Sequence, residues 1–165
     1  MNTQIATPPI APLAPDKIEA AAELVAFFQE GWRTGATDPE RFFAHFGARF
    51  TPDCLLTQPL AAPARGPEGL RQLFGPLFHA VPDLRVDVVR WGATDDGALI
   101  EIRLHGTLGG RPLVWTAVDR LVLRDGLIAE RHSYFDPLPL ALTLLRRPRA
   151  SAALVRALIA GRRRA

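Results

Sequence analysis

Residues 113–136 read LVWTAVDRLVLRDGLIAERHSYFD, and this stretch decides the fold. Apolar residues recur at every second position up to Arg124-Asp125-Gly126, a tripeptide typical of a tight turn, and a second extended run follows it. A two-residue period is typical of a strand with one buried face. The stretch therefore predicts two antiparallel strands joined as a hairpin.

Asp119 is the first candidate functional residue, because it lies midway along the apolar row of the first strand. Burial disfavours the charged form of a carboxyl group unless a cation compensates it. Two interpretations stay open at this point. Asp119 is either one half of a structural ion pair, with an arginine of the next strand, or the acid or base of a cavity enzyme.

The last strand can face either way. In one register, the three residues on the cavity side are Arg131, Ser133 and Phe135. In the other register they are Glu130, His132 and Tyr134. We favour the first register, because Arg131 can then pair with Asp119 and hold it ionised. His132 and Tyr134 remain alternatives that would carry protons if they faced the cavity.

Upstream of this hairpin the apolar spacing is helical at first and extended later. It predicts helices over residues 16–35, from residue 38 onward and over 68–81, and strands over 54–58, 84–91 and 99–108. Helices grouped before strands are typical of an α+β fold. We expect a curved antiparallel sheet that wraps around the N-terminal helices and encloses a pocket.

The chain divides into three segments. Residues 1–15 form an uncharged, proline-rich arm that is expected to be disordered; residues 16–138 form the folded domain; residues 139–165 form a basic helical extension, broken at Pro148. Seven arginines and no acidic residue follow Leu145, while the preceding residues carry 13 basic and 17 acidic side chains. We expect the extension to pack over the domain or a second copy, in preference to contact with nucleic acid or a membrane.

Composition excludes several classes of protein. The single cysteine, Cys54, rules out an internal disulfide and a zinc site of several cysteines. No secretory signal and no apolar run of the ~18 residues that a membrane span requires is found, so we expect a cytoplasmic protein. Neither His45 nor His79 has metal-ligating neighbours at a suitable spacing, so no metal site is expected.

Five short motifs resemble the nuclear-transport-factor-2-like superfamily. They are Gly66-Pro67-Glu68-Gly69-Leu70-Arg71, His79-Ala80-Val81-Pro82-Asp83-Leu84, His105-Gly106-Thr107, Val118-Asp119-Arg120 and Arg124-Asp125-Gly126-Leu127-Ile128-Ala129-Glu130. Over residues 20–138 the chain is similar to the SnoaL-like polyketide cyclases, whose relatives include ketosteroid isomerase and limonene-epoxide hydrolase. The resemblance implies a cone-shaped α+β domain, and it implies a homodimer through the outer sheet face at Val114, Val118 and Val122.

The resemblance also implies roles for two residues. Asp119 matches the cavity carboxylic acid of the isomerases and one acid–base carboxylate of the epoxide hydrolases. His105 precedes it by fourteen residues, a spacing similar to the His…Asp pair of the cyclases. However, a two-residue turn at Gly109-Gly110 would point His105 to the opposite sheet face, and only a one-residue bulge would reverse that.

The chain departs from both groups of enzymes. Gln58 replaces the isomerase base, and Phe28 replaces a tyrosine of the isomerase oxyanion hole. Ala117 and Ser133 stand where the epoxide hydrolases have arginine and aspartate. Neither chemistry is therefore carried over intact.

The sequence predicts a cofactor-independent enzyme that applies acid–base catalysis to an apolar small molecule, by cyclisation, isomerisation or epoxide opening. The candidate catalytic residues are Asp119, His105 and Arg131. The candidate pocket residues are Phe28, Trp32, Gln58, Trp115, Ser133 and Phe135. The alternative is a non-catalytic module of the same fold that binds a small molecule or a protein, which the missing second catalytic group favours.

Overall fold

The computed structural model describes residues 13–35 and 38–162, with the side chains of residue 153 and residues 157–162 left aside. Most of the predicted N-terminal arm lies outside these residues. Two helices come first, α1 (Pro15–Gly35) and α2 (Pro39–Gly47), and a third, α3 (Gly66–Ala80), follows the first two strands. Asp38 caps α2 by accepting hydrogen bonds from the backbone N–H groups of Glu40 and Arg41.

Aromatic side chains fasten these helices to one another. The rings in contact come from all three helices: Phe28, Trp32, Phe42, Phe46, Phe74 and Phe78. The centroids of Trp32 and Phe42 are 4.8 Å apart, and those of Phe42 and Phe78 are 5.0 Å apart. Such ring pairs stabilise a core beyond the apolar area that they bury.

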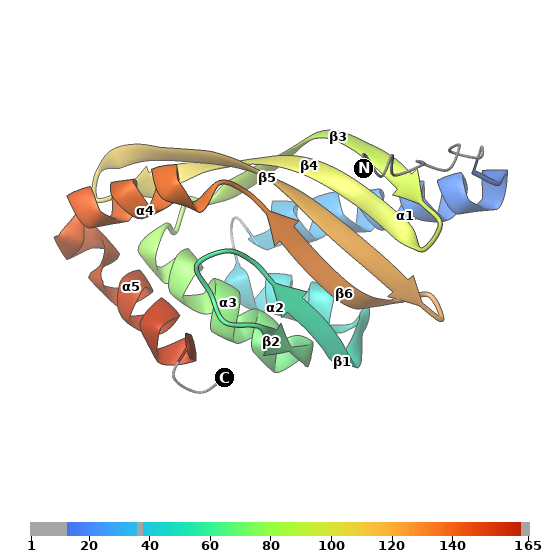
Figure 1. Ribbon diagram of the computed structural model, residues 1–165, viewed down its shortest axis with the longest axis horizontal. Helices are drawn as coiled ribbons and strands as arrows, with labels where there is room; N and C mark the ends of the chain where they lie inside the picture. Colours follow the sequence, from blue (N-terminus) through green and yellow to red (C-terminus); the bar gives the residue numbers. More distant parts are fainter. Residues whose placement is uncertain (1–12, 36–37, 163–165) are drawn as a thin grey trace, which may run out of the picture.

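Six strands form one sheet, which Figure 1 shows curving over the helices. They are β1 (Phe50–Thr57), β2 (Ala64–Arg65), β3 (Arg85–Thr94), β4 (Gly97–Leu108), β5 (Arg111–Arg124) and β6 (Leu127–Tyr134), in the order β2-β1-β6-β5-β4-β3. The four predicted antiparallel strands, β3 to β6, are confirmed. The short strand β1 pairs parallel to β6, so the sheet as a whole is mixed.

Two tight turns fix the register of the central strands. Gly109 and Gly110 have φ of 59° and 74°, and Asp125 and Gly126 have φ of 54° and 78°. Positive φ at both central residues is the geometry of the two-residue turn that matches the twist of a hairpin. The pairing of β4 with β5 then runs without a bulge from Leu108 to Gly97.

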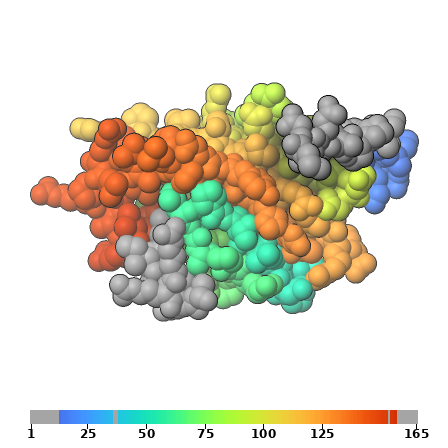
Figure 2. All heavy atoms as spheres, in the orientation of Figure 1, coloured from blue at the N-terminus to red at the C-terminus, as the bar shows by residue number. Residues whose placement is uncertain are grey.

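The C-terminal residues form two helices, α4 (Pro137–Arg146) and α5 (Pro148–Arg162), which break at Pro148 as predicted. Both lie at one end of the molecule (Figures 1 and 2). Arg147, at the corner between them, donates hydrogen bonds to the carbonyl oxygens of Leu108, Arg111 and Pro112. The corner is thereby fastened to the β4–β5 hairpin. None of the described helices combines the length and apolarity that crossing a bilayer requires.

Candidate functional site

The centre of the site is a buried ion pair between β5 and β6. Asp119 is fully buried, and the side chain of Arg131 is 8% exposed. Arg131 Nε donates to Asp119 Oδ2 at 2.8 Å, and Arg131 Nη2 donates to Asp119 Oδ1 at 3.1 Å. Both carboxylate oxygens therefore accept from one planar guanidinium, which is the strong, bidentate form of this interaction.

The facing of the last strand follows from this pair. Asp119 lies opposite Ser133 in the β5–β6 register, so Arg131 and Ser133 are on the inner face with Asp119. Arg131 and Ser133 are both buried. The favoured register is confirmed, and the alternative set of Glu130, His132 and Tyr134 lies on the outer face.

Arg131 extends the site toward β1 and α3. Its Nη1 donates to Gln58 Oε1 at 3.1 Å, and its guanidinium carbon lies 5.1 Å from the centroid of the Phe74 ring. Gln58 comes directly after β1, in the same alternating row as the buried residues Cys54 and Leu56. The Phe74 ring and the Gln58 amide thus contact the guanidinium from α3 and from the end of β1.

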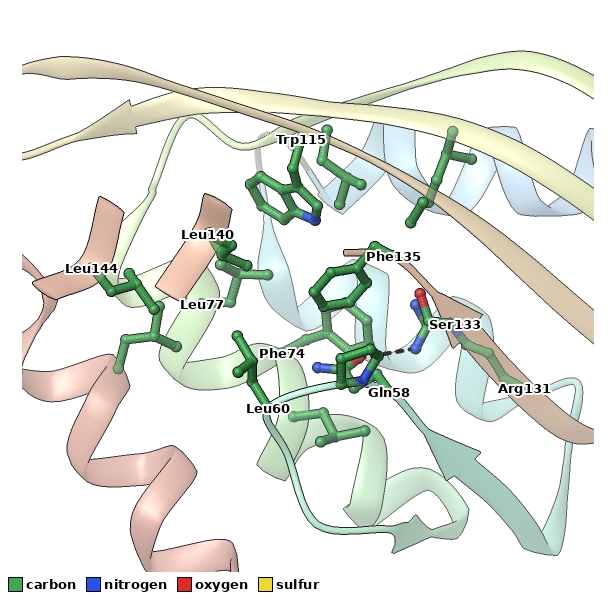
Figure 3. Close-up of a pocket in the computed structure, with 16 residues that line it drawn as sticks. Gln58, Leu60, Phe74, Leu77, Trp115, Arg131, Ser133, Phe135, Leu140 and Leu144 are labelled. Carbon is green, nitrogen blue, oxygen red and sulfur yellow. Dashed lines mark hydrogen bonds between the residues drawn. The ribbon is translucent and has the colours of Figure 1, made fainter. Parts of the chain in front are cut away.

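A cavity of about 60 Å³ lies beside this guanidinium (Figure 3). Its polar lining side chains are Gln58, Arg131 and Ser133, and its walls include Trp115, Phe135, Phe74, Leu77, Leu140 and Leu144. A single buried water needs roughly 10–15 Å³ of such space, so only a small ligand fits without movement of the walls. Asp119 is not part of the lining and lies behind Arg131.

Five of the predicted site residues therefore meet at this cavity: Gln58, Trp115, Arg131, Ser133 and Phe135. Phe28 and Trp32 do not line it. They belong to the aromatic core and border a second, smaller cavity of about 10 Å³, which also touches Arg131. The expectation that they form part of the same pocket is corrected, because α1 packs these rings against α2 and α3.

His105 is not brought to Asp119. His105 pairs with Val114, and Asp119 pairs with Ile100. His105 and Ile100 are an odd number of positions apart along β4, so His105 and Asp119 face opposite sides of the sheet. The two-residue turn without a bulge is the reason. His105 Nε2 instead lies 3.0 Å from Asp87 Oδ2 on the outer face.

The C-terminal helices supply wall residues that the sequence reasoning missed. Leu140 and Leu144 of α4 and Leu154 of α5 line the cavity. The spacing of Leu140 and Leu144, four residues apart, is a helical signal for a shared face. It did not indicate which part of the domain that face covers.

The outer face of β5 and β6 carries a second group of polar residues. His132 Nδ1 lies 2.5 Å from Thr57 Oγ1, and His132 Nε2 lies 2.8 Å from Glu130 Oε2. Next to them, Arg120 Nη2 donates to Asp96 Oδ2 at 2.5 Å. These side chains are half-exposed, so water screens their charges. The homodimer expected at this face stays a prediction.

Cys54 lies on the inner face of β1 and is fully buried. Burial, and after it the negative charge of Asp53, raises the pKa of the Cys54 thiol to about 12. A thiol in this state is neutral near pH 7 and is a poor nucleophile. Within the described residues, no group of three or more histidine, cysteine or acidic side chains is placed to hold a metal ion.

Solved structures share this fold. The chain is 21% identical, with a TM-score of 0.66, to a protein from Jannaschia sp. CCS1 named as a SnoaL-like polyketide cyclase, over 79% of this chain and 94% of that one. It is 20% identical, with a TM-score of 0.59, to an LEH-like epoxide hydrolase from M. tuberculosis, over 84% and 98% of the two chains.

A third structure, TerC co-crystallised with polyporic acid, is 16% identical with a TM-score of 0.63, over 74% of this chain and 96% of that one. Identities of this size show a common fold and leave activity open. A search of curated protein sequences found no match. A model of the SnoaL-like domain matches residues 24–131, well over half of the sequence, and the chain therefore belongs to the SnoaL-like domain family.

Proposed function

We propose that the chain binds a small, mainly apolar molecule that carries a neutral oxygen acceptor, with Arg131 as the donor to that oxygen. The observation that carries this proposal is the lining of the cavity: apolar walls and one buried guanidinium. A few polar groups in an apolar pocket are the usual pattern of a small-molecule site.

The hydrogen-bond inventory of Arg131 supports this role. A guanidinium has five N–H donors. Nε, one N–H of Nη1 and one of Nη2 are used within the described residues, toward Asp119 and Gln58. One further donor remains on each Nη nitrogen for a ligand at the cavity edge.

The charge of the site narrows the ligand class. Asp119 compensates the positive charge of Arg131, so the pair is neutral overall. A neutral pair favours a carbonyl, ester or epoxide oxygen over a carboxylate, because an anion would bring an uncompensated charge into an apolar cavity.

Two ligands of the same shape test the proposal. Acetophenone has a carbonyl oxygen where ethylbenzene has hydrogens. We expect acetophenone to bind about tenfold more tightly in an NMR titration followed at the indole of Trp115, since a hydrogen bond to a charged donor contributes ~1.5 kcal/mol or more. Equal affinities would contradict a role of Arg131 in recognition.

The matched control removes the ion pair without leaving a lone charge. In the double variant Asp119→Leu/Arg131→Met, both ligands should bind equally well, because the cavity keeps apolar walls of similar volume. If that variant still prefers acetophenone, the donor is another residue, such as Gln58 or Ser133.

Acid–base catalysis by Asp119 is the second candidate function. Membership of the SnoaL-like family favours it. Asp119 lies behind Arg131, so this function requires Arg131 to move aside and let the carboxylate reach the ligand. Its test is exchange of the methyl protons of acetophenone in D₂O, in which a base takes a proton from carbon and solvent returns deuterium. Wild-type protein should accelerate the exchange and folded Asp119→Asn should not. An unchanged exchange rate in Asp119→Asn would leave binding as the function.

A further inference from the structure

Helix α4 has two apolar faces, and only one of them is covered. Leu140 and Leu144 point into the cavity (Figure 3). On the opposite side three leucines are exposed: Leu138 by 61%, Leu142 by 40% and Leu145 by 73%. Their spacing of four and three residues places them on one stripe along the helix. We call Leu138, Leu142 and Leu145 the leucine stripe.

The surroundings of the leucine stripe are basic. Arg146 and Arg149 are exposed at the corner where α4 meets α5, and Arg111 is exposed on the hairpin to which that corner is bound. The acidic residue nearest to α4 in sequence, Asp136, lies at the other end of the helix and accepts the hydrogen bond that caps it. From Pro137 onward the chain has no acidic residue.

We propose that α4 binds to the surface of an anionic lipid membrane, with the leucine stripe inserted among the acyl chains and the arginines of the corner at the headgroups. An apolar stripe beside basic residues on one helix is the pattern of a helix that lies in the membrane interface. Positive charges near the headgroups add to the apolar contact, because anionic lipids attract them.

The attachment of α4 suits such a surface. Arg147 fastens the corner through three carbonyl oxygens, and Ser151 Oγ donates to the carbonyl oxygens of Leu144 and Arg147. The leucine stripe is thus presented by a fixed helix at the surface, where Figure 2 shows α4 in orange. No ordering cost of the helix opposes binding.

The sequence alone favoured a helix packed over the domain or over a second copy, and Leu140 and Leu144 do pack over the domain. The exposed second face is what the structure adds. Because Leu140 and Leu144 belong to the same helix, a membrane at the leucine stripe lies one helix diameter from the cavity. The membrane contact is independent of the chemistry at Asp119, and the two are tested by different measurements.

Sedimentation with lipid vesicles tests the proposal on the full chain. We expect the protein to pellet with vesicles of phosphatidylcholine and phosphatidylglycerol, less so as salt rises, and not with vesicles of phosphatidylcholine alone. The double variant Leu142→Gln/Leu145→Gln should bind about tenfold or more weakly, since two leucines no longer leave water. Arg146→Gln/Arg149→Gln should lose about fivefold per arginine, the equivalent of ~1 kcal/mol each.

Matched variants on the sheet exclude a general effect. Leu99→Gln/Leu127→Gln and Arg65→Gln/Arg103→Gln change exposed residues of the same kinds, and both should bind vesicles as the wild type does. All the substituted residues are exposed, so the variants should fold, as thermal melts will verify. Sedimentation velocity without lipid measures whether the leucine stripe joins two copies.

Three results would overturn the proposal. The first is no binding to anionic vesicles. The second is binding that depends on the arginines and not on the leucines, which means a purely electrostatic contact. The third is a dimer that Leu142→Gln/Leu145→Gln dissociates while vesicle binding is absent, which assigns the leucine stripe to a second copy of the chain.

Discussion

Asp119 and Arg120 are neighbours in β5, and Arg131 and His132 are neighbours in β6. Neighbouring residues of a strand lie on opposite faces of the sheet, so the two members of each pair are in different environments. Asp119 and Arg131 form a buried, bidentate pair on the inner face. Arg120 and His132 form half-exposed contacts on the outer face. The chemical groups are of the same types and the backbone is shared, so burial is the variable that differs.

The difference bears on the function of each group. On the inner face, removal of one member of the ion pair leaves a buried charge that water cannot solvate. A ligand bound there also meets few competing polar groups. Outside, water replaces a lost partner at little cost. The inner pair therefore has the larger effect on both stability and recognition, although the outer group contains more side chains.

The largest effect is expected from Arg131→Met, which leaves Asp119 buried and unpaired. We expect a loss of about 3–5 kcal/mol in the free energy of unfolding, measured by urea denaturation. Asp119→Leu/Arg131→Met should recover most of this loss, because both charges are then absent. A single variant that loses less than about 1 kcal/mol would show that water reaches the inner pair.

On β1, the buried Cys54 and the exposed Asp53 offer a second comparison between a buried and an exposed titratable group. The pKa of Cys54 is raised by burial to about 12, whereas the neighbouring Thr51 hydroxyl and the hydrogen bond from Arg124 lower the pKa of the exposed Asp53. At about pH 8, the raised pKa alone should slow the labelling of Cys54 by a thiol reagent on the order of 10³-fold relative to the unfolded chain. Labelling in concentrated urea is the control, and equal rates would contradict the burial of Cys54.

The raised pKa of Cys54 also predicts that the free energy of unfolding depends on pH. The pKa of Cys54 in the folded protein lies above its ordinary value of 9.0, so the thiol contributes its full stability below about pH 9. That stability is lost as the pH rises toward 12. Urea denaturation at several pH values should show this decline in the free energy of unfolding. The variant Cys54→Ala should lack the part of the decline that is due to the thiol.

The smallest effect is expected on the outer face. Glu130→Gln removes the charge beside His132, and we expect a change below about 1 kcal/mol in the free energy of unfolding. A double-mutant cycle with His132→Gln should give a coupling of similar size. A loss above about 2 kcal/mol would mean that this face is buried in solution, as in the predicted homodimer.

The position of the inner pair was predictable because its signals are local. The two-residue period places Asp119 and Arg131 on definite faces, and the turns at Gly109-Gly110 and Asp125-Gly126 fix the register. The same local logic shows that His105 faces away from Asp119. The membership of Phe28 and Trp32 in the core, and not in the cavity, depends on how three helices pack, for which no local pattern exists.

The sequence by itself determined the four antiparallel strands β3 to β6, their hairpins, the α+β class and the buried row that contains Asp119, since each follows from the period or the turn chemistry of neighbouring residues. Tertiary structure alone decided three further features. They are the parallel pairing of β1 with β6, the use of both Asp119 oxygens by Arg131, and the closure of the cavity by α4 with the leucine stripe left outside. These contacts join segments far apart in the chain, and their energies depend on packing geometry that no short stretch of residues encodes.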